Sequence, residues 1–400
     1  MLQSFSQNFL LSLLRKSPWL YKSLRFLFRF AVNLSVDFFR AISPRNSLFG
    51  PPKGYFSDVT VLRDKKIQGR IILPCQKVPA IGRDSLRKRC GLGQDCFQPW
   101  PIFWSHHSKA RLVGPTLVLL NQKKQASLEA MYNLHCYKND PGYRYLKLPP
   151  PVRLEGNWTS VVSMWSQGFY HWFADVLPRL ALLSEFPSDT RIITPPLNFS
   201  YEKDTLKLLG LEQRIRPTFE RHLIVEDFYF SSPTAMTGCY DPFAIDCLRW
   251  NFLKFADESF DSPRRFYVGR VGKTRGVINE QQVLDEMARR GWGIVDCEQL
   301  SMAQQIKLFS NAEAVCALHG AALTNLIWCR PGCRVFELVA ENYSNGVFEG
   351  IAEIVGLHHR YLMCEADSAF RAFVPMDQFK PFLDGETFSH QFKPASHSFH

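Results

Sequence analysis

The C-terminal part of the sequence predicts an α/β fold in which a parallel sheet carries helices on both faces. The first observation is that short apolar runs alternate with segments whose apolar residues repeat about every 3.6 positions. The second is that glycine and proline turns separate these segments. Strand–helix alternation of this kind is typical of parallel sheets built from βαβ units.

Five strands and four helices are predicted after residue 264. The strands are Arg265–Gly269, Trp292–Asp296, Ala314–Leu318, Arg334–Leu338 and His359–Met363. The helices are Asn279–Arg290, Ser301–Phe309, Leu323–Trp328 and Phe348–Val355. Gly291 stops the first helix, and Ser-x-x-Gln opens the second as a capping box. Ala314–Leu318 is entirely apolar and is expected to be a buried strand.

Upstream of this region the organisation is less regular. Residues 51–155 contain several prolines and few periodic runs, whereas a periodic region extends from Trp158 past Phe230. The acidic stretch Phe252–Pro263 ends in Ser-Pro and marks a boundary. We therefore predict three segments: 1–50, an N-terminal α/β domain over 51–255, and a C-terminal Rossmann-like domain over 256–400.

The composition restricts the partners. The chain has 400 residues and a net charge of +11, which predicts an anionic partner. The basic residues are dispersed and match no nucleic-acid-binding motif, so nucleic acid is not expected. The 11 cysteines are scattered and lack zinc-site spacing, which favours free thiols in a reducing compartment and no metal.

Residues 8–40 form a basic, Leu- and Phe-rich segment. Arg15, Lys22 and Arg29 recur every seven residues, and no uncharged stretch reaches the roughly 20 residues of a membrane span. The pattern predicts an amphipathic helix that lies either on an anionic membrane surface or on the body of the protein.

His319-Gly320-Ala321-Ala322 follows the buried strand Ala314–Leu318. Ligands bind at the carboxyl ends of strands in open parallel sheets. Gly320 permits a sharp turn and a close approach, and the following helix offers free N–H groups to an anion. His319 and the side chains of Thr324 and Asn325 add polar contacts. The alternative is a capped turn whose histidine bonds its own backbone.

A basic loop follows the strand Arg265–Gly269. It carries Arg270, Lys273 and Arg275 between glycines, which suits a pyrophosphate. The alternative is a solvated surface loop. Phosphate-binding Walker and Gly-x-Gly-x-x-Gly motifs are absent, which argues against ATP hydrolysis and dinucleotide redox chemistry.

Glu337 lies in the strand Arg334–Leu338, on the same face as Val335. A carboxylate at a buried position needs a partner. A pair of ribose hydroxyls would satisfy both oxygens, and the alternative is an ion pair with an arginine.

A further candidate site lies in Gln167–Leu183. If this stretch is helical, His171, Asp175 and Arg179 share one face, and Pro178 perturbs the helix. A histidine and a carboxylate one turn apart can act as a base and its orienting group. The alternative is a structural pair beneath an aromatic layer.

Together these residues resemble glycosyltransferase family 61. The resemblance rests on Tyr170-His171-Trp172-x-x-Asp175-x-Leu177-Pro178-Arg179, the loop Arg270–Arg275, His319-Gly320-Ala321-x-Leu323-Thr324-Asn325, and Pro331-Gly332 with Glu337, and it covers roughly Trp158–Cys364. It implies a GT-B-like fold, with two Rossmann-type domains facing a cleft, and inverting transfer from a nucleotide sugar, usually a UDP-sugar, to a glycan or polysaccharide acceptor.

Bacterial members of this family are often linked to capsular polysaccharide synthesis, whereas eukaryotic members usually carry a secretory signal or anchor. A bacterial protein at the inner face of the cytoplasmic membrane is therefore expected. The sequence contains no Asp-x-Asp, the metal clamp of the other major glycosyltransferase fold, so a metal-independent site without a cofactor is predicted.

The mechanism that follows is a single displacement at the anomeric carbon. Asp175, oriented by His171, would take the acceptor proton. The diphosphate would be held by His319, the N–H groups of Ala321 and Ala322, and the basic loop, and Glu337 would hold the ribose. Two alternatives stay open: a nucleotide-sugar-binding protein without catalysis, and a scaffold for polysaccharide-synthesis enzymes.

Overall fold

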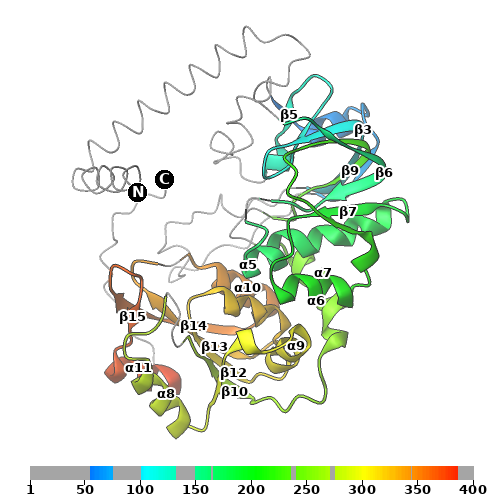
Figure 1. Ribbon diagram of the computed structural model, residues 1–400. Coiled ribbons are helices and arrows are strands. Elements are labelled where there is room, and N and C mark those ends of the chain that lie inside the picture. The colour runs from blue at the N-terminus through cyan, green and yellow to red at the C-terminus, as the bar shows by residue number, and fades with distance from the viewer. Residues whose placement is uncertain are drawn as a thin grey trace, which may run out of the picture.

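Two β-sheets, one in each half of the chain, organise the fold (Figure 1). The computed structural model describes residues 55–74, 101–131, 149–163, 165–235, 240–270, 275–343 and 345–385. The predicted amphipathic helix at 8–40, the segment 1–50 and Lys273 lie outside the described residues. The mixed α/β class is confirmed, whereas the boundary between 255 and 256 stays a prediction.

The C-terminal sheet has six strands in the order β11-β10-β12-β13-β14-β15. The strands are β10 (Arg265–Val268), β11 (Gly293–Val295), β12 (Ala314–Leu318), β13 (Arg334–Ala340), β14 (His358–Ala366) and β15 (Ala372–Phe373). All neighbours pair in parallel except β14 and β15. Each predicted strand is therefore present.

The predicted helices connect these strands. They are α8 (Glu280–Arg289), α9 (Met302–Ser310), η10 (Ala321–Trp328) and α10 (Val347–Val355), followed by α11 (Met376–Asp384). Gly291 follows α8 with φ of 70°. This backbone conformation favours glycine, as expected for a helix stop. Ser301 and Gln304 form the predicted capping box of α9. The segment η10 is a 3₁₀-helix and not an α-helix, and it begins two residues earlier than predicted.

The strand order places a topological switch point between β10 and β12. From β10 the chain passes through α8 to β11 on one side and then returns through α9 to β12 on the other side. In parallel sheets, the loops at such a point diverge and leave a crevice at the carboxyl ends of the two strands. Both polar motifs of this region, the basic loop and the His-Gly turn, follow these two strands.

The N-terminal sheet differs from the predicted Rossmann type. Its path is β1-β5-β4-β3-β9-β6-β7-β8, with β2 also paired to β3. The strands are β1 (Tyr55–Phe56), β2 (Gly69–Leu73), β3 (Ile102–Val113), β4 (Val118–Leu120), β5 (Ala126–Ser127), β6 (Val152–Ser160), β7 (Arg191–Thr194), β8 (Ile215–Pro217) and β9 (His222–Ser231).

Antiparallel pairing in this sheet has a local cause. A tight turn with Gly114 at φ of 80° and Leu117 at φ of 49° joins β3 directly to β4. A connection this short permits only antiparallel strands. Around β3 the pairs with β2, β4 and β9 are antiparallel, whereas β6 pairs in parallel with β7 and β9, and β7 with β8. The sheet is therefore mixed, and the expectation of two doubly wound parallel sheets holds only for the C-terminal half.

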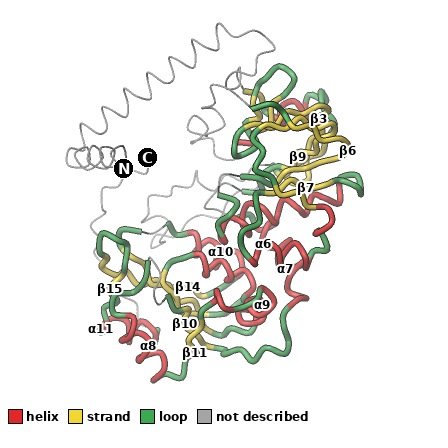
Figure 2. The backbone as a smooth tube through the Cα atoms, in the orientation of Figure 1, coloured by secondary structure: helices red, strands yellow, loops and turns green. Residues whose placement is uncertain are grey.

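Helical segments lie between the two sheets (Figure 2). The helical segments of the N-terminal half, wherever they lie, are α3 (Asp58–Arg63), η2 (Glu129–Met131), α5 (Phe169–His171), η5 (Trp172–Val176), η6 (Leu177–Glu185), α6 (Ser200–Leu208), η7 (Glu212–Arg214), α7 (Pro242–Phe252) and η8 (Leu253–Phe255). Of these, α6 and α7 lie with α10 in the layer between the sheets, whereas α8 and α11 lie on the far side of the C-terminal sheet.

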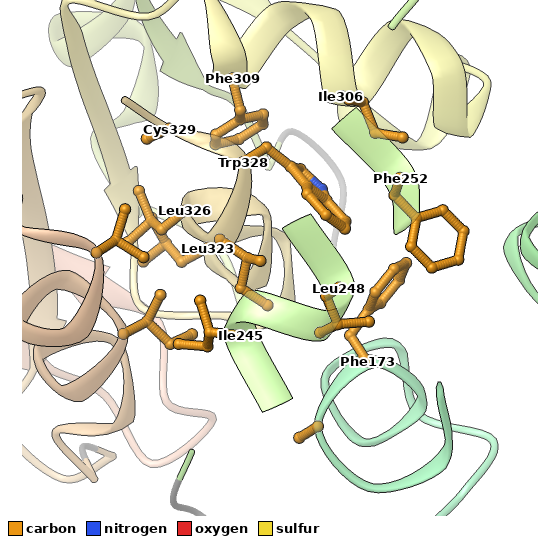
Figure 3. Packing of buried hydrophobic residues seen from close by; sticks show 14 of the residues in the cluster. Phe173, Ile245, Leu248, Phe252, Ile306, Phe309, Leu323, Leu326, Trp328 and Cys329 are labelled. Atoms are coloured by element: carbon orange, nitrogen blue, oxygen red, sulfur yellow. The ribbon is translucent and has the colours of Figure 1, made fainter. Parts of the chain in front are cut away.

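One hydrophobic core connects the two halves. Phe173 from η5, Phe252 from α7 and Trp328 from η10 are all buried in it (Figure 3). The ring of Trp328 lies 5.8 Å from that of Phe173 and 5.9 Å from that of Phe252. Val315 and Ala317 of β12 face this core, whereas Cys316 faces the second core beneath α8. The shared core thus fixes the segment around His171 against the helix that follows His319.

Phe173→Ala tests the importance of this core. We expect a loss of about 3–5 kcal/mol in the free energy of unfolding, because a buried ring is replaced by a cavity. Urea denaturation followed by circular dichroism measures it. Phe219→Ala is the matched control, since Phe219 is 85% exposed. Removing that exposed ring should change the stability by less than about 0.5 kcal/mol. Equal midpoints for both variants would contradict a core shared by the two halves.

Candidate functional site

The carboxyl ends of β10 and β12 bring together the two predicted anion-binding motifs. Arg270 follows β10 after one glycine, and His319 follows β12 directly. Because the two strands are parallel neighbours, their ends meet at one edge of the sheet. The Arg270 guanidinium donates a hydrogen bond from Nη1 to the carbonyl oxygen of His319 at 3.2 Å. The backbone N–H of Arg270 donates to the Glu280 carboxylate at 2.8 Å.

Gly320 leaves room for a neighbouring side chain and does not make the sharp turn that was predicted. Its φ of 172° is extended backbone. Any residue adopts such a conformation, so no sharp turn depends on the glycine. A Cβ at this position would lie 2.5 Å from Nη1 of Arg270 and 3.1 Å from its Cζ. The group that approaches closely is therefore the Arg270 guanidinium.

A second guanidinium lies beside the first. Arg275 places its Cζ 4.1 Å from the centre of the Tyr343 ring, and that ring lies 5.8 Å from the His319 imidazole. Burial, together with the positive charge of Arg275, lowers the pKa of Arg270. Within the described ranges, no carboxylate forms a salt bridge with either guanidinium. An anionic ligand would relieve this like-charge pair.

Glu337 lies behind His319 and has two imidazole partners. Its Oε1 is 2.5 Å from His319 Nδ1, and its Oε2 is 2.7 Å from His359 Nε2. Burial would raise the pKa of Glu337, but the charge of His319 and the hydrogen bonds of both histidines outweigh burial and lower that pKa to about 2. Opposite charge and hydrogen bonding both favour the ionised form. The carboxylate therefore stays ionised at neutral pH.

This arrangement corrects the predicted role of Glu337. Its side chain is fully buried, and its oxygens meet histidines instead of an arginine. A ribose hydroxyl could reach it only by displacing an imidazole. Glu337 is therefore a positioning residue that orients His319 and leaves Nε2 of that ring as the nitrogen available to a ligand.

The residues after Gly320 divide into two groups. Ala321 is exposed and Ala322 half-buried, so the first turn of η10 lies at the surface. Asn325, in contrast, is buried: its amide donates to Gln305 at 2.9 Å and to the Ala322 carbonyl at 3.1 Å, and it accepts from Trp328 at 3.0 Å. Thr324 is also buried. The bonds of Asn325 are thus made within the protein, whereas the Thr324 hydroxyl has no hydrogen-bond partner among the described residues, and the predicted ligand contacts of the two side chains stay a prediction.

The segment around His171 changes helix type instead of forming one α-helix. The α-turn α5 continues into the π-helix η5, which passes into the 3₁₀-helix η6 one residue before Pro178. The missing N–H of proline is accommodated by this change. His171 and Asp175 still meet, with 2.7 Å between Nδ1 and Oδ2. Arg179 does not join them, since it donates to the carbonyls of Ser160 and Ser231.

The burial of this pair favours the opposite assignment to the one predicted for His171 and Asp175. The Asp175 side chain is 1% exposed, whereas that of His171 is 25% exposed. A buried carboxylate cannot reach an acceptor hydroxyl, but it can orient the imidazole in front of it. The indole of Trp165 stacks on His171 with 5.4 Å between ring centres and is itself 39% exposed. His171 is therefore the group of this pair that can meet a substrate, and Trp165 is a site residue that the sequence did not suggest.

An aromatic chain joins this pair to His319. The Tyr170 ring contacts His171 and lies 6.3 Å from Phe348, and Phe348 lies 5.0 Å from His319. The rings of two motifs far apart in sequence thus converge on Phe348 at the start of α10. The structure thus forms two groups, His171 with Asp175 and Arg270 with Arg275, His319 and Gly320, and connects them through the rings of Tyr170 and Phe348.

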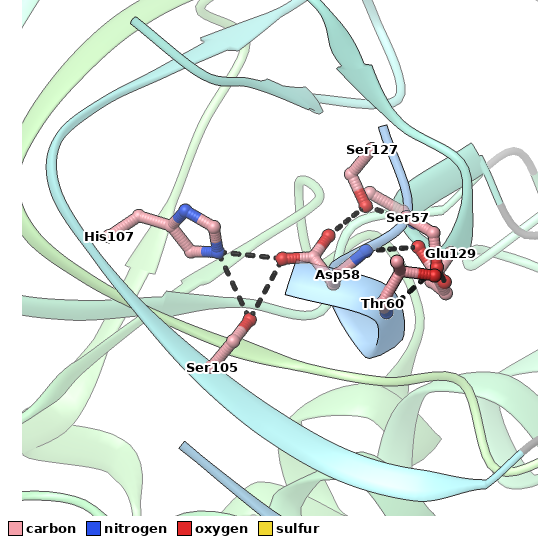
Figure 4. Close-up of polar contacts among 8 residues, drawn as sticks. Ser57, Asp58, Thr60, Ser105, His107, Ser127 and Glu129 are labelled. Carbon is pink, nitrogen blue, oxygen red and sulfur yellow. Dashed lines mark hydrogen bonds and ion pairs between the residues drawn. The ribbon is translucent and has the colours of Figure 1, made fainter. Parts of the chain in front are cut away.

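A separate polar cluster in the N-terminal sheet resembles a Ser-His-Asp triad (Figure 4). Asp58 is buried, and its Oδ1 lies 2.8 Å from His107 Nε2 and 3.0 Å from Ser105 Oγ. Ser105 Oγ also lies 3.0 Å from the same nitrogen of His107. A proton relay needs serine and aspartate on opposite nitrogens of the imidazole. The cluster therefore anchors α3 to β3 and is not a nucleophile site.

The described residues contain no group of three or more His, Cys, Asp or Glu side chains arranged to hold a metal ion. Their cysteines are free thiols. Within the same ranges, no helix combines the length and apolar content needed to cross a bilayer.

The fold and the site define an α/β protein in which aromatic packing connects a cationic strand-end site to a His–Asp pair. Comparison with known families agrees with the motif resemblance: residues 169–336 match the family model described as Glycosyltransferase 61. The matched range contains the His–Asp pair, the cationic site and much of the shared core.

A curated relative points the same way. A 96-residue stretch is 27% identical to the beta-1,2-xylosyltransferase of Arabidopsis thaliana. The stretch covers 21% of this chain and 18% of the plant protein, so the chain spans less than a fifth of that relative's length.

Replacing Glu337 by glutamine tests the buried carboxylate. Its folded pKa of about 2 lies below the ordinary 4.5. Its stabilisation is therefore complete above the ordinary pKa and is lost as the pH falls toward the folded one. We expect Glu337→Gln to cost about 3–5 kcal/mol at neutral pH, since both histidines lose a charged partner.

Urea denaturation tests whether the charge of Glu337 stabilises the fold. The midpoints are measured at neutral pH and again about four pH units lower, and the exposed Glu220→Gln is the control. The difference in urea midpoint between wild type and Glu337→Gln should be smaller at the acidic pH. A constant gap would show that the charge of Glu337 does not stabilise the fold.

Proposed function

We propose that the protein is an inverting, metal-independent glycosyltransferase that uses a nucleotide-sugar donor, with a UDP-sugar as the preferred class. The observation that carries this proposal is the group of Arg270, Arg275 and His319 at the switch point of a parallel sheet, with no salt bridge to the two guanidiniums among the described residues. The family match and the xylosyltransferase relative support the reaction class.

The donor diphosphate occupies the edge of the C-terminal sheet in this proposal. Arg270 and Arg275 supply fixed positive charge, and the first turn of η10 supplies N–H groups at Ala321 and Ala322. Nε2 of His319, oriented by Glu337, adds a further contact. As the bond between the anomeric carbon and the diphosphate breaks, negative charge grows on the leaving group next to these cations. The absence of Asp-x-Asp from the sequence supports charge stabilisation by side chains.

The acceptor approaches from the side of His171. The acceptor hydroxyl oxygen forms a bond to the anomeric carbon while its proton passes to Nε2 of His171, and the diphosphate departs with the bonding electrons. Asp175 holds the imidazole through Nδ1 and stabilises the charge that the ring gains. The exposed face of Trp165 beside His171 offers a surface on which a sugar ring can stack. A glycan or polysaccharide is the acceptor class.

Donor binding is tested by calorimetry with UDP. We expect Arg270→Gln and His319→Ala each to weaken UDP binding by about tenfold or more, because each loses a charge-assisted contact. Gly320→Ala should weaken it as well, since the added methyl would displace the Arg270 guanidinium. The exposed Arg330→Gln carries the same charge change as Arg270→Gln and should bind UDP like wild type.

A thermal-shift screen of UDP-, GDP-, dTDP- and CMP-sugars, with and without a chelator, identifies the donor class. Stabilisation by one class that survives the chelator supports the proposal. Unchanged UDP affinity in Arg270→Gln and His319→Ala would remove the phosphate site.

Catalysis is tested on the His–Asp pair with the donor that the screen identifies. We expect His171→Ala to lower kcat by about 100- to 10,000-fold while UDP affinity stays unchanged, because a positioned base acts only in the transition state. Asp175→Asn should also lower kcat and should change the pH profile. If wild type binds UDP but transfers no sugar, or if His171→Ala keeps its activity within a few-fold, the catalytic assignment fails.

A further inference from the structure

A second cationic site lies along β6, β7 and β8, three strands of the N-terminal sheet that pair in parallel. A cavity of about 570 Å³ opens there, which is the size of a small-ligand pocket. Four arginines line it: Arg153, Arg191, Arg214 and Arg216. Glu155 is the carboxylate among the lining residues.

Strand register explains how these arginines gather. Trp158 of β6 pairs with Arg191 of β7, and two residues further along β7, Ile193 pairs with Arg216 of β8. Residues at alternate positions share one face of a sheet, so Arg191 and Arg216 project on the same side. Arg153 lies at the start of β6, and Arg214 precedes β8 in η7.

Part of this positive charge is buried without a partner. Nη2 of Arg214 and Nη1 of Arg216 are inaccessible to solvent and make no hydrogen bond within the described part of the chain. The remaining contacts fix the guanidiniums but do not neutralise them: Arg214 Nε donates to the Thr190 carbonyl at 2.8 Å, and Arg191 Cζ lies 5.0 Å from the centre of the Trp158 ring. In the ranges that the structure describes, none of the four arginines forms a salt bridge.

We propose that this arginine pocket binds a ligand through a multiply charged phosphate group. Buried N–H donors without acceptors are costly, and a ligand that supplies oxygens removes the cost. The pocket is lined by four guanidiniums and one carboxylate, which leaves an excess of positive charge. A single carboxylate on a ligand would neutralise only part of that charge. A diphosphate or phosphomonoester offers more charge and several oxygens, and it matches the planar fork of arginine.

The arginine pocket is separate from the site proposed for sugar transfer. None of the residues that line it belongs to the site proposed for sugar transfer, and α5, which ends at His171, begins nine residues after β6 ends. The donor cations belong to the other sheet. The inference therefore stands whether or not the protein transfers a sugar.

Calorimetry with inorganic pyrophosphate tests the proposal on the full chain. Because pyrophosphate would also bind the donor site, the background protein carries Arg270→Gln and Arg275→Gln. This background should still bind pyrophosphate at one site. Adding Arg216→Gln should weaken the binding about tenfold or more, through the loss of charge-assisted hydrogen bonds. Adding the exposed Arg330→Gln should change it by less than about twofold, which controls for net charge.

Thermal unfolding separates ligand binding from a structural role. Pyrophosphate should raise the melting temperature of the background protein and leave that of the Arg216→Gln variant unchanged. Without ligand, Arg216→Gln should melt no lower than the background, because the change removes a buried unpaired charge. Pyrophosphate affinity that does not depend on Arg216, or a lower melting temperature with an undiminished ligand effect, would overturn the proposal.

A vesicle assay distinguishes two sources of the phosphate group. Phosphatidylcholine vesicles with and without phosphatidic acid are sedimented with the background protein and with its Arg216→Gln variant. Arg216-dependent binding to the phosphatidic acid vesicles assigns the pocket to a lipid headgroup. Arg216-dependent binding to pyrophosphate without vesicle binding assigns it to a soluble phosphate ester.

Discussion

The site depends on one buried carboxylate held between two imidazoles. Glu337 lies in β13, where a charged side chain with no partner would cost several kcal/mol. Its bonds to His319 and His359 tie together the end of β12, the middle of β13 and the start of β14. His319 is thereby fixed at the point where Arg270 contacts its carbonyl and lies across Gly320. The positions of the strand-end cations thus follow from an interaction that no ligand touches.

The same constraint reaches the other half of the protein through packing. Phe348 contacts the fixed His319 ring on one side and Tyr170 on the other, and Tyr170 precedes His171. Beneath these rings, Phe173 and Trp328 belong to one core shared by both halves. Packed aromatic rings therefore connect the His–Asp pair to His319. Close packing of this kind restricts how far the two groups can move relative to each other.

Local sequence patterns predicted secondary structure and short-range contacts. They did not predict contacts whose partner lies in another helix or strand. The strands and helices after residue 264 follow from apolar periodicity, caps and glycine stops, and Ala314–Leu318 has the predicted bounds. The partner of Glu337 could not be predicted, because His359 becomes its neighbour only when β14 pairs with β13. The spacing of His171 and Asp175 predicted their contact, but their roles depend on which one the surrounding helices bury. Of the strands that pair antiparallel with β3, β2 and β4 lie where the sequence shows little periodicity.

The chain has a net charge of +11, and the structure gathers arginines into two clusters, one in each sheet. In each of these two clusters, no carboxylate of the described residues lies within salt-bridge distance of the guanidiniums. Burial in each cluster also removes water that would otherwise screen their charges. Surface arginines spread over a chain repel one another weakly, but clustered and half-buried ones destabilise the unliganded fold. A fold retains such clusters most readily when an anion offsets their cost. Ligand binding therefore explains these two clusters better than fold stability does. The first cluster is Arg270 with Arg275, and the second is Arg214 with Arg216.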